Sequence, residues 1–440
     1  MKRLLPIALS LMLLTGCAVS AALPDGLDTQ PEPTISEAQS APTPSPSPEP
    51  EVYRASVGIV GDILMMTSQI QGAKTAAGYD FKPSFYAMQP LFSSVDIMAG
   101  NFECTLAGEA AGYTQRRPAA PPPTEDDPNP KQPYQTFNAP DELAADLRAV
   151  GFDLLTTANN HCLDRRDAGL RRTITVLDSL HIPHTGTFLS KQHRSKVSPL
   201  IVDVKGLKIA MLSYTYGTNG IPVQGSVVVN YIDRDRIGAD IDEARSRGAE
   251  VVCVNLHWGI EYQLLPVESQ RSLAHWLVEE KGVDLIIGGH PHVIEPMELR
   301  HSHRFNKDVL LVYSMGNFIS NQNGDDSRGG AMVLVNLTAR AGKLKRIKAS
   351  YRLFFCQKPL RSAKAAPKST SEADPTNYQL IPAHRADLIR PDSRAAFNLF
   401  MRNARRIFGS HNIGVPETAQ PDQLPQRPYL DGNLPALLLR

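Results

Sequence analysis

The chain has 440 residues, which is enough to bury a large core in one large domain or in two smaller ones. Its 46 Lys and Arg residues nearly balance its 45 Asp and Glu residues, so no global positive field calls for nucleic acid and none is expected as a partner. Proline is frequent, at 35 residues, and is concentrated in a few segments.

The N-terminal sequence is typical of a secretory signal peptide. Two basic residues precede an apolar stretch that is too short for a lasting membrane span, and the segment ends in Leu-Thr-Gly-Cys. This ending resembles the bacterial lipobox, in which the cysteine becomes the lipidated first residue of the mature protein. A plain signal peptide with a chance cysteine is the alternative. We therefore predict a signal at 1–17, lipidation of Cys17, and an extracytoplasmic protein that is lipid-anchored to the cell membrane.

Composition divides the rest of the chain into segments. Residues 18–51 are rich in proline and contain no aromatic residue, Lys or Arg, which predicts a disordered tether. The main domain is predicted at 52–355, with a proline-rich surface insertion at 118–133. Residues 356–440 are a C-terminal extension, in which 390–409 predict a basic amphipathic helix. Packing of this helix on the domain is favoured over contact with an anionic polymer or lipid headgroups.

Strand-like apolar runs alternate with amphipathic helical patterns through the main domain. This alternation predicts an α/β layered fold with largely parallel sheet. The cysteines outside the signal are scattered, so no disulfide bond is predicted. Strands are predicted within 52–62, 152–161, 207–215, 250–258, 283–290, 308–318 and 330–338, and helices at 141–151, 168–182, 235–248 and 269–282.

Polar residues follow five apolar runs at the points where the predicted strands end. Because the carboxyl ends of parallel strands share one edge of a sheet, we expect these side chains to converge. Carboxylate, amide and imidazole groups are ligands for divalent cations. Each residue alone has an ordinary alternative, such as a turn residue, a helix cap or a core imidazole. The set comprises Asp62, Asn101, Glu103, Asn159, Asn160, His161, His257, His290 and His292.

The run ending in Gly-Gly-His290-Pro291-His292 gives the strongest single signal. A buried strand pattern stops at two glycines, and two imidazoles then flank a proline that fixes the backbone between them. Imidazoles two residues apart can share one target. The joint pattern of all these strand ends therefore predicts a functional cluster.

Six segments carry a resemblance to a known family. They are GIVGDILMM, AGNFECTL, TTANNHCLDRRDAGL, LHWGIEY, GGHPHVIEP and VYSMGNFI, within about residues 55–325. In this order they resemble the signatures of the capsule-synthesis CapA family, the poly-γ-glutamate synthesis proteins, which is related to the calcineurin-like metallophosphoesterases. The resemblance implies a four-layered α/β/β/α sandwich of the metallophosphoesterase type, with its site at the strand ends.

The resemblance also implies residue roles. One or two divalent metal ions would be held by Asp62, Glu103, Asn160, His257, His290 and His292. His161 and Glu261 would be catalytic acids or bases, and Asn101 and Asn317 would contact substrate.

The sequence departs from the simple phosphoesterase pattern in two places. Leu64 stands where those enzymes carry histidine, and the Asn-Phe-Glu of 101–103 stands where they carry aspartate. One metal position has thereby lost an imidazole. Near the motifs, only Arg165 and Arg166 offer the positive charge expected of a phosphate clamp.

Three functions follow as hypotheses for a surface-anchored protein of capsule or poly-γ-glutamate synthesis. The favoured one is a metal-dependent hydrolase or transferase that acts on an anionic extracellular polymer such as poly-γ-glutamate. The alternatives are a polymer-binding, export or anchoring module without turnover, and an inactive scaffold with a vestigial site. The expected partners are the polymer, the membrane through the lipid anchor, and membrane-bound synthase subunits.

Overall fold

The computed structural model of the chain describes residues 51–115, 135–360 and 377–418. The predicted signal with Cys17, the tether at 18–51 except for Glu51, and the proline-rich insertion at 118–133 lie outside the described residues. All described residues belong to one unit, Pro50–Arg440.

The first sheet contains the strands that carry the N-terminal motifs. Its order is β18-β17-β16-β1-β4-β5-β6, and the short strand β15 also pairs with β1. Strands β1, β4, β5 and β6 run parallel, whereas β16, β17 and β18 are antiparallel to their neighbours. The bounds are β1 Val52–Ile63, β4 Ile97–Phe102, β5 Leu154–Thr156, β6 His184–Thr185, β15 Asn317–Ile319, β16 Gly329–Arg340, β17 Lys343–Gln357 and β18 Gln379–Pro382.

The second sheet carries the later histidines. Its order is β13-β14-β12-β11-β9-β8, with a parallel centre and one antiparallel strand at each edge. The prediction of largely parallel sheet therefore holds for the strands that carry the motifs and fails at the outer strands. The bounds are β8 Leu200–Val204, β9 Leu207–Thr215, β11 Val251–His257, β12 Leu285–Gly289, β13 Ile294–Ser302 and β14 Lys307–Met315.

Helices begin and end close to the predicted positions. The helix α3 ends at Gly151, whose φ of 116° is a backbone conformation that favours glycine. The helix α6 begins after Asp233, whose carboxylate accepts from the backbone N–H of Arg236 at 2.8 Å. The bounds are α1 Thr67–Ala73, α2 Gln89–Phe92, α3 Glu142–Val150, α4 Arg166–Ser179, α5 Lys191–Val197, α6 Arg234–Ser246 and α7 Glu268–Glu279. The short strands are β2 Lys74–Thr75, β3 Gly78–Tyr79, β7 Thr187–Phe188 and β10 Val228–Val229.

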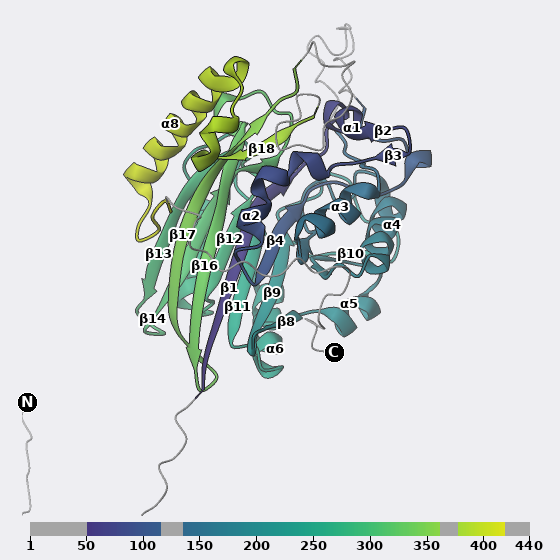
Figure 1. The fold of residues 1–440 in the computed structure, drawn as a ribbon. Coiled ribbons are helices and arrows are strands. Elements are labelled where there is room, and N and C mark those ends of the chain that lie inside the picture. Colours follow the sequence, from purple (N-terminus) through teal and green to yellow (C-terminus); the bar gives the residue numbers. More distant parts are fainter. Residues whose placement is uncertain (1–50, 116–134, 361–376, 419–440) are drawn as a thin grey trace, which may run out of the picture. The chain divides into compact units, whose positions relative to one another are not determined.

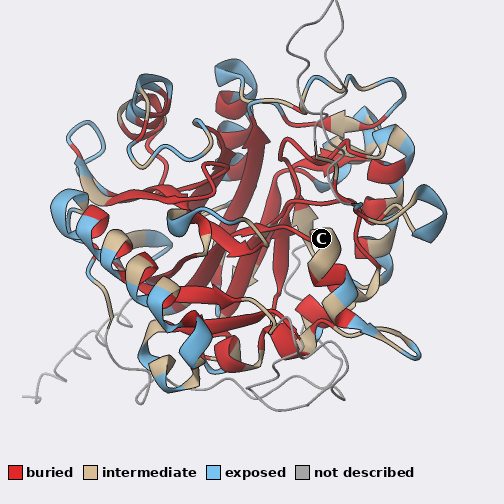
Figure 2. Ribbon diagram, turned by 90° about the horizontal axis from the view of Figure 1, so that it is seen from above, coloured by how far each residue is buried: buried red, intermediate tan, exposed pale blue. Residues whose placement is uncertain are grey.

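The two sheets pack face to face with helices on both outer faces (Figures 1 and 2). Side chains such as Val57 from β1 and Cys253 from β11 belong to one buried cluster between the sheets. The outer face of the first sheet packs against α3 through a second cluster, which includes Leu147 and Phe152. The outer face of the second sheet packs against α6 and α7 through a third, which includes Trp276. The α/β/β/α order predicted for the domain is confirmed.

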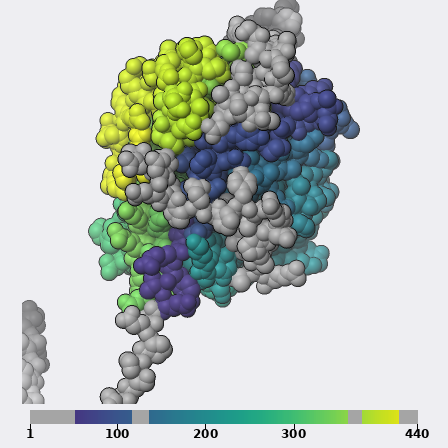
Figure 3. Space-filling view, in the orientation of Figure 1, coloured from purple at the N-terminus to yellow at the C-terminus, as the bar shows by residue number. Residues whose placement is uncertain are grey.

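The C-terminal helix α8, Arg394–His411, closes one open side of the sandwich. Its apolar residues, among them Phe397, Phe400 and Phe408, belong to the cluster between the sheets, and the helix contacts both β13 and β17. The packing interpretation of this helix was therefore right. In the space-filling view α8 (yellow) forms part of the same surface as the early segments of the domain (blue) (Figure 3). Within the described residues, no helix combines the length and the apolar character needed to cross a membrane.

We predict that Phe400→Ala lowers the free energy of unfolding by about 3–5 kcal/mol, because it empties a buried ring site. The ring is 1% exposed, and its centroid lies 6.2 Å from that of Phe355 in β17. Chemical denaturation followed by circular dichroism measures the change. Arg402→Ala, at an exposed position of the same helix, is the control and is expected to change stability little. Equal stability of the two variants would contradict a core role for α8.

Candidate metal centre

The strand ends of both sheets meet at one place. In the first sheet, Asp62 at the end of β1 lies opposite Asn101 of β4, and it also pairs with Asn317 of β15. In the second sheet, His257 at the end of β11 lies opposite Gly289 of β12. Sequence reasoning expected this convergence because parallel strands deliver their carboxyl ends to a common edge.

Asp62 is the most heavily partnered group of the cluster. Its side chain is fully buried, and Oδ1 accepts from the amide nitrogen of Asn101 at 2.8 Å. Oδ2 accepts from the backbone N–H of His290 at 3.1 Å and lies 3.3 Å from Nδ1 of His292. Burial alone would raise the pKa of this carboxyl, but the contact with His292, together with the hydrogen bond from Asn101, helps to outweigh burial, and the pKa lies well below its usual range. Asp62 is therefore ionised and available to bind a cation.

The carboxylate of Glu103, unlike that of Asp62, lacks hydrogen-bond partners among the described residues. Its carboxylate is fully buried, and neither oxygen has a hydrogen-bond partner among the described residues, although Oε1 lies 3.4 Å from Nε2 of His257. Burial, followed by the charges of Asp62 and Glu261, raises the pKa of Glu103 well above its ordinary value. A buried carboxylate without partners is costly unless a proton or a metal cation neutralises it. This orphaned group therefore fits a metal site.

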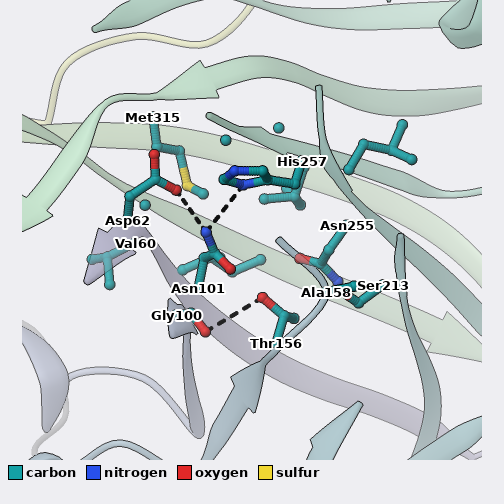
Figure 4. A pocket seen from close by; sticks show the side chains of 16 residues that line it. Val60, Asp62, Gly100, Asn101, Thr156, Ala158, Ser213, Asn255, His257 and Met315 are labelled. Carbon is teal, nitrogen blue, oxygen red and sulfur yellow. Dashed lines mark hydrogen bonds between the residues drawn. The ribbon is translucent and has the colours of Figure 1, made fainter. Parts of the chain in front are cut away.

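Two asparagines hold His257 in place. Its Nε2 lies 2.9 Å from Oδ1 of Asn160, and its Nδ1 lies 3.2 Å from the amide nitrogen of Asn101. The amide of Asn101 thus bridges Asp62 and His257, above a cavity of about 20 Å³ between the sheets (Figure 4). Asn159 supports this arrangement, because its amide nitrogen donates to Oδ1 of Asn101 at 3.2 Å. Burial lowers the pKa of His257 well below its usual range, so the ring is neutral and able to bind metal.

The backbone of the Gly-Gly-His-Pro-His segment is shaped by close contacts. A Cβ on Gly289 would lie 2.7 Å from Oδ1 of Asp62, and one on Gly288 would lie 1.9 Å from the carbonyl oxygen of Tyr313. His290 and His292 have φ values of 98° and 59°, which residues with side chains rarely adopt. Such strain persists at functional sites where the surroundings enforce it. The two glycines thus let the strand end approach Asp62 and turn both imidazoles into the cluster.

Two groups of side chains in the described chain could each hold a metal ion. Glu103, His257 and His290 form one triad, and Asp62, Glu103 and His292 form the other, with ligand atoms within 4.8 Å of one another in each. Nδ1 of His290 is buried without a hydrogen-bond partner among the described residues, whereas Nδ1 of His292 lies 3.3 Å from Oδ2 of Asp62. Burial lowers the pKa of His290 to about 3, so its ring is neutral at pH 7. The mixed oxygen and nitrogen donors suit a divalent cation of the zinc, iron or manganese type.

His161 lies beside the cluster and has a partner that sequence reasoning missed. Its Nδ1 is 2.7 Å from Oδ2 of Asp164, and its ring packs 4.4 Å from that of Phe137. The same carboxylate oxygen accepts from the backbone N–H of Phe137 at 2.6 Å. Asp164 therefore fixes the orientation and tautomer of His161. The spacing of three residues between the two in one motif was the signal that could have found it.

Other predicted residues lie around the cluster rather than in it. Glu261 is half-buried in the loop after β11, which is tied to the His-Pro-His segment by a 2.8 Å bond from Tyr262 N–H to Pro291 O. The amide nitrogen of Asn317 donates to Gln322 and to the backbone of Ser327, so this side chain holds the loop after β15. The role predicted for Asn317 in contacting substrate remains a prediction.

The sequence departures have clear structural counterparts. Leu64, which replaces the histidine of simple phosphoesterases, is buried in the core cluster on the outer face of the first sheet. Arg165 donates to the carbonyl oxygens of Ala111, Gly112 and Asp164, so its guanidinium holds the loop beyond β4. A phosphate clamp by Arg165 is therefore unsupported.

Two exposed tyrosines flank the histidines and were not predicted. The ring of Tyr216, directly after β9, lies 4.5 Å from that of His290, and the ring of Tyr262 lies 6.0 Å from that of His292. They are 48% and 55% exposed. We refer to Tyr216 and Tyr262 as the aromatic rim. Exposed rings beside a buried polar cluster give a substrate a surface to pack against.

The fold and the cluster together define a class: an α/β/β/α protein with a carboxylate–imidazole centre at its strand ends. The family model described as "Bacterial capsule synthesis protein PGA_cap" matches residues 56–322. The chain belongs to this family of bacterial capsule synthesis proteins.

Two curated relatives agree with this assignment. The PGA biosynthesis protein CapA of Bacillus subtilis (strain 168) is 31% identical over 286 residues, which cover 64% of this chain and 67% of that protein. The capsule biosynthesis protein CapA of Bacillus anthracis is 26% identical over 298 residues, 64% of each chain. The chain thus spans about two thirds of the length of these relatives. The calcineurin-like phosphoesterase YfkN of Bacillus subtilis is similar in structure, with 17% identity, a TM-score of 0.42, and coverage of 68% of this chain and 91% of that one.

We predict that Gly289→Ala weakens metal binding by about 10- to 100-fold, because the new methyl group would displace Asp62. Elemental analysis of the purified protein after dialysis against a graded series of chelator concentrations measures the loss. Gly409→Ala is the control, since a Cβ there meets nothing within 4 Å. Unchanged metal retention in Gly289→Ala would show that the close approach of β12 to Asp62 is not needed for the site.

Proposed function

We propose that this protein is a surface-anchored, metal-dependent hydrolase or transferase that acts on an anionic capsule polymer such as poly-γ-glutamate. The observation that carries the proposal is the pair of buried carboxylates, Asp62 and Glu103, surrounded by imidazoles at the strand ends. Membership of the capsule synthesis family supports the polymer as the substrate. The names of the two Bacillus relatives support the same process.

In the proposed reaction, different residues bind the metal ion and transfer protons. A divalent ion held by Asp62, Glu103, His257, His290 and His292, with Asn160 beside them, would polarise a substrate oxygen and lower the pKa of a bound water. His161, held by Asp164 through Nδ1, keeps Nε2 as the nitrogen that exchanges a proton with the substrate. Glu261 stands close enough to influence the charge of Glu103 and supplies a second acid or base.

The surroundings favour an amide substrate over a phosphoester. Arg165 is engaged by backbone carbonyls, and the neighbouring groups that face the cluster are amides, imidazoles and the aromatic rim. A γ-linked glutamyl chain carries amide carbonyls between short methylene stretches, which suit contact with Tyr216 and Tyr262. An amide carbonyl would be attacked by water in hydrolysis or by an amine in transfer.

A polymer-binding or export module without turnover is the second candidate. The buried Leu64 favours it, because the position that supplies an imidazole to the metal in simple phosphoesterases is apolar here. In that case the same centre would grip carboxylates of the growing chain and guide it past the membrane synthase that we propose as a partner. Metal content, turnover and chelation separate the two functions.

We predict that Glu261→Gln retains metal but lowers polymer cleavage or transfer by about 10²- to 10⁴-fold, since it removes a proton-transfer group. His290→Ala is expected to lose both metal and turnover. Size-exclusion analysis of poly-γ-glutamate after incubation measures turnover, and elemental analysis measures metal. Glu268→Gln, at an exposed position in the first turn of α7, is the control. If the wild-type protein shows no turnover and still binds polymer after chelation, the result would contradict the enzyme and support the polymer-binding module.

We further propose that the mature protein is lipidated at Cys17 and held outside the cytoplasmic membrane by the 18–51 tether. The basic start, the apolar stretch and the Leu-Thr-Gly-Cys ending support this placement. One acyl-bearing residue and a long spacer would leave the domain free to reach polymer at the cell surface.

We predict that Cys17→Ser moves the protein from the membrane pellet to the soluble extracytoplasmic fraction or leaves its signal uncleaved. Fractionation with immunoblotting and mass spectrometry of the N-terminus measure both outcomes. Cys104→Ser is the matched cysteine control, and it is expected to stay lipidated. Wild-type protein without an acylated N-terminus would refute the anchor.

A further inference from the structure

A second cavity lies away from the metal centre, at the edge where the two sheets end. It is formed by the end of α4, the start of β6, the helix α5 and the start of β8. Its volume is about 360 Å³, which is large enough for a small organic molecule. Ile182 and Leu200 contribute apolar surface to it. None of its lining residues belongs to the metal centre.

One buried imidazole in this cavity has an unused nitrogen. The side chain of His184 is only 7% exposed, and its Nε2 lies 3.1 Å from Oδ1 of Asp178. Its Nδ1 is buried and has no hydrogen-bond partner among the described residues. A buried polar atom of this kind costs about 1–3 kcal/mol unless something pairs with it. A ligand in the cavity would supply that partner.

The mouth of the cavity is positively charged. Lys196 and Arg247 line it, both are exposed, and neither forms an ion pair within the part of the chain that is described. Asp178 is the one carboxylate of the lining, and it is already engaged by His184. His181 and His193 complete the polar lining. Two free cations, one buried imidazole and an apolar floor therefore face a single space.

We propose that this cavity is a binding site for an organic carboxylate with a short aliphatic skeleton. The carboxylate would pair with Lys196 and Arg247 at the mouth, a second polar group would meet Nδ1 of His184, and the methylene groups would pack on Ile182 and Leu200. A γ-linked glutamyl unit belongs to this chemical class, and in naming that unit the inference rests on the proposed function. The cavity would then hold one part of a polymer separately from the metal centre.

The test titrates γ-glutamylglutamate into the full-length protein in the presence of a chelator, by isothermal calorimetry. We expect binding, and we expect Lys196→Ala and Arg247→Ala each to weaken it by at least about fivefold, since each removes one charge-assisted hydrogen bond. Lys191→Ala, at an exposed position of the same short helix and outside the cavity lining, is the control and is expected to bind like the wild type. Persistence of binding in His290→Ala would separate this site from the metal centre.

Specific results would overturn the inference. These are no binding at millimolar concentration, equal affinity in Lys196→Ala, Arg247→Ala and the control, or loss of binding on chelation or in His290→Ala. Equal competition by inorganic phosphate would show a general anion site and would reject the carboxylate class. Because these measurements need no turnover, failure here leaves the proposed activity at the metal centre standing, and loss of that activity leaves this site standing.

Discussion

The structure depends on the burial of two carboxylates side by side where the sheets meet. Asp62 and Glu103 are both fully buried, and two negative charges at one buried place repel each other. The charge of Asp62 is stabilised by hydrogen bonds from Asn101 and from the backbone of His290, and by the nearby ring of His292. It provides no hydrogen bond for Glu103 within the described residues. This unequal compensation is what a bound cation would complete, and the strained backbone at 290–292 serves to hold the imidazoles there.

Much of the fold and of the cluster was predictable because each strand ends where its apolar run stops. Asp62, His257 and His290 all follow such runs, and parallel pairing brings the ends of their strands to a common edge. The contact between Asp62 and the backbone of His290 joins residues 228 positions apart. The apolar pattern of the sequence cannot predict this contact, because it does not show how one sheet packs against the other.

The strands that escaped prediction have weakened patterns. In β17 the basic residues between Lys343 and Lys348 are exposed and obscure the start of the strand, whereas all residues from Tyr351 to Gln357 are buried. In β13 the residue Pro296 argues against a strand, although the strand lies at a sheet edge, where proline is tolerated. The aromatic rim was missed for another reason. Tyr216 follows β9 just as His257 ends β11, but the residues predicted to form the cluster were metal-capable or hydrogen-bonding residues at the strand ends, and Tyr216 was not among them.

Glu103 is central to both candidate metal-binding triads. Both possible triads contain this residue, so its carboxylate is the one group common to them. An aspartate at position 103 would be one methylene shorter, so its carboxylate would lie further from the imidazoles of the second sheet. Glu103 would therefore be a ligand of a divalent ion held by either triad. Neither triad uses a group from position 64, so the buried leucine there leaves both candidate sets of donors complete among the described residues.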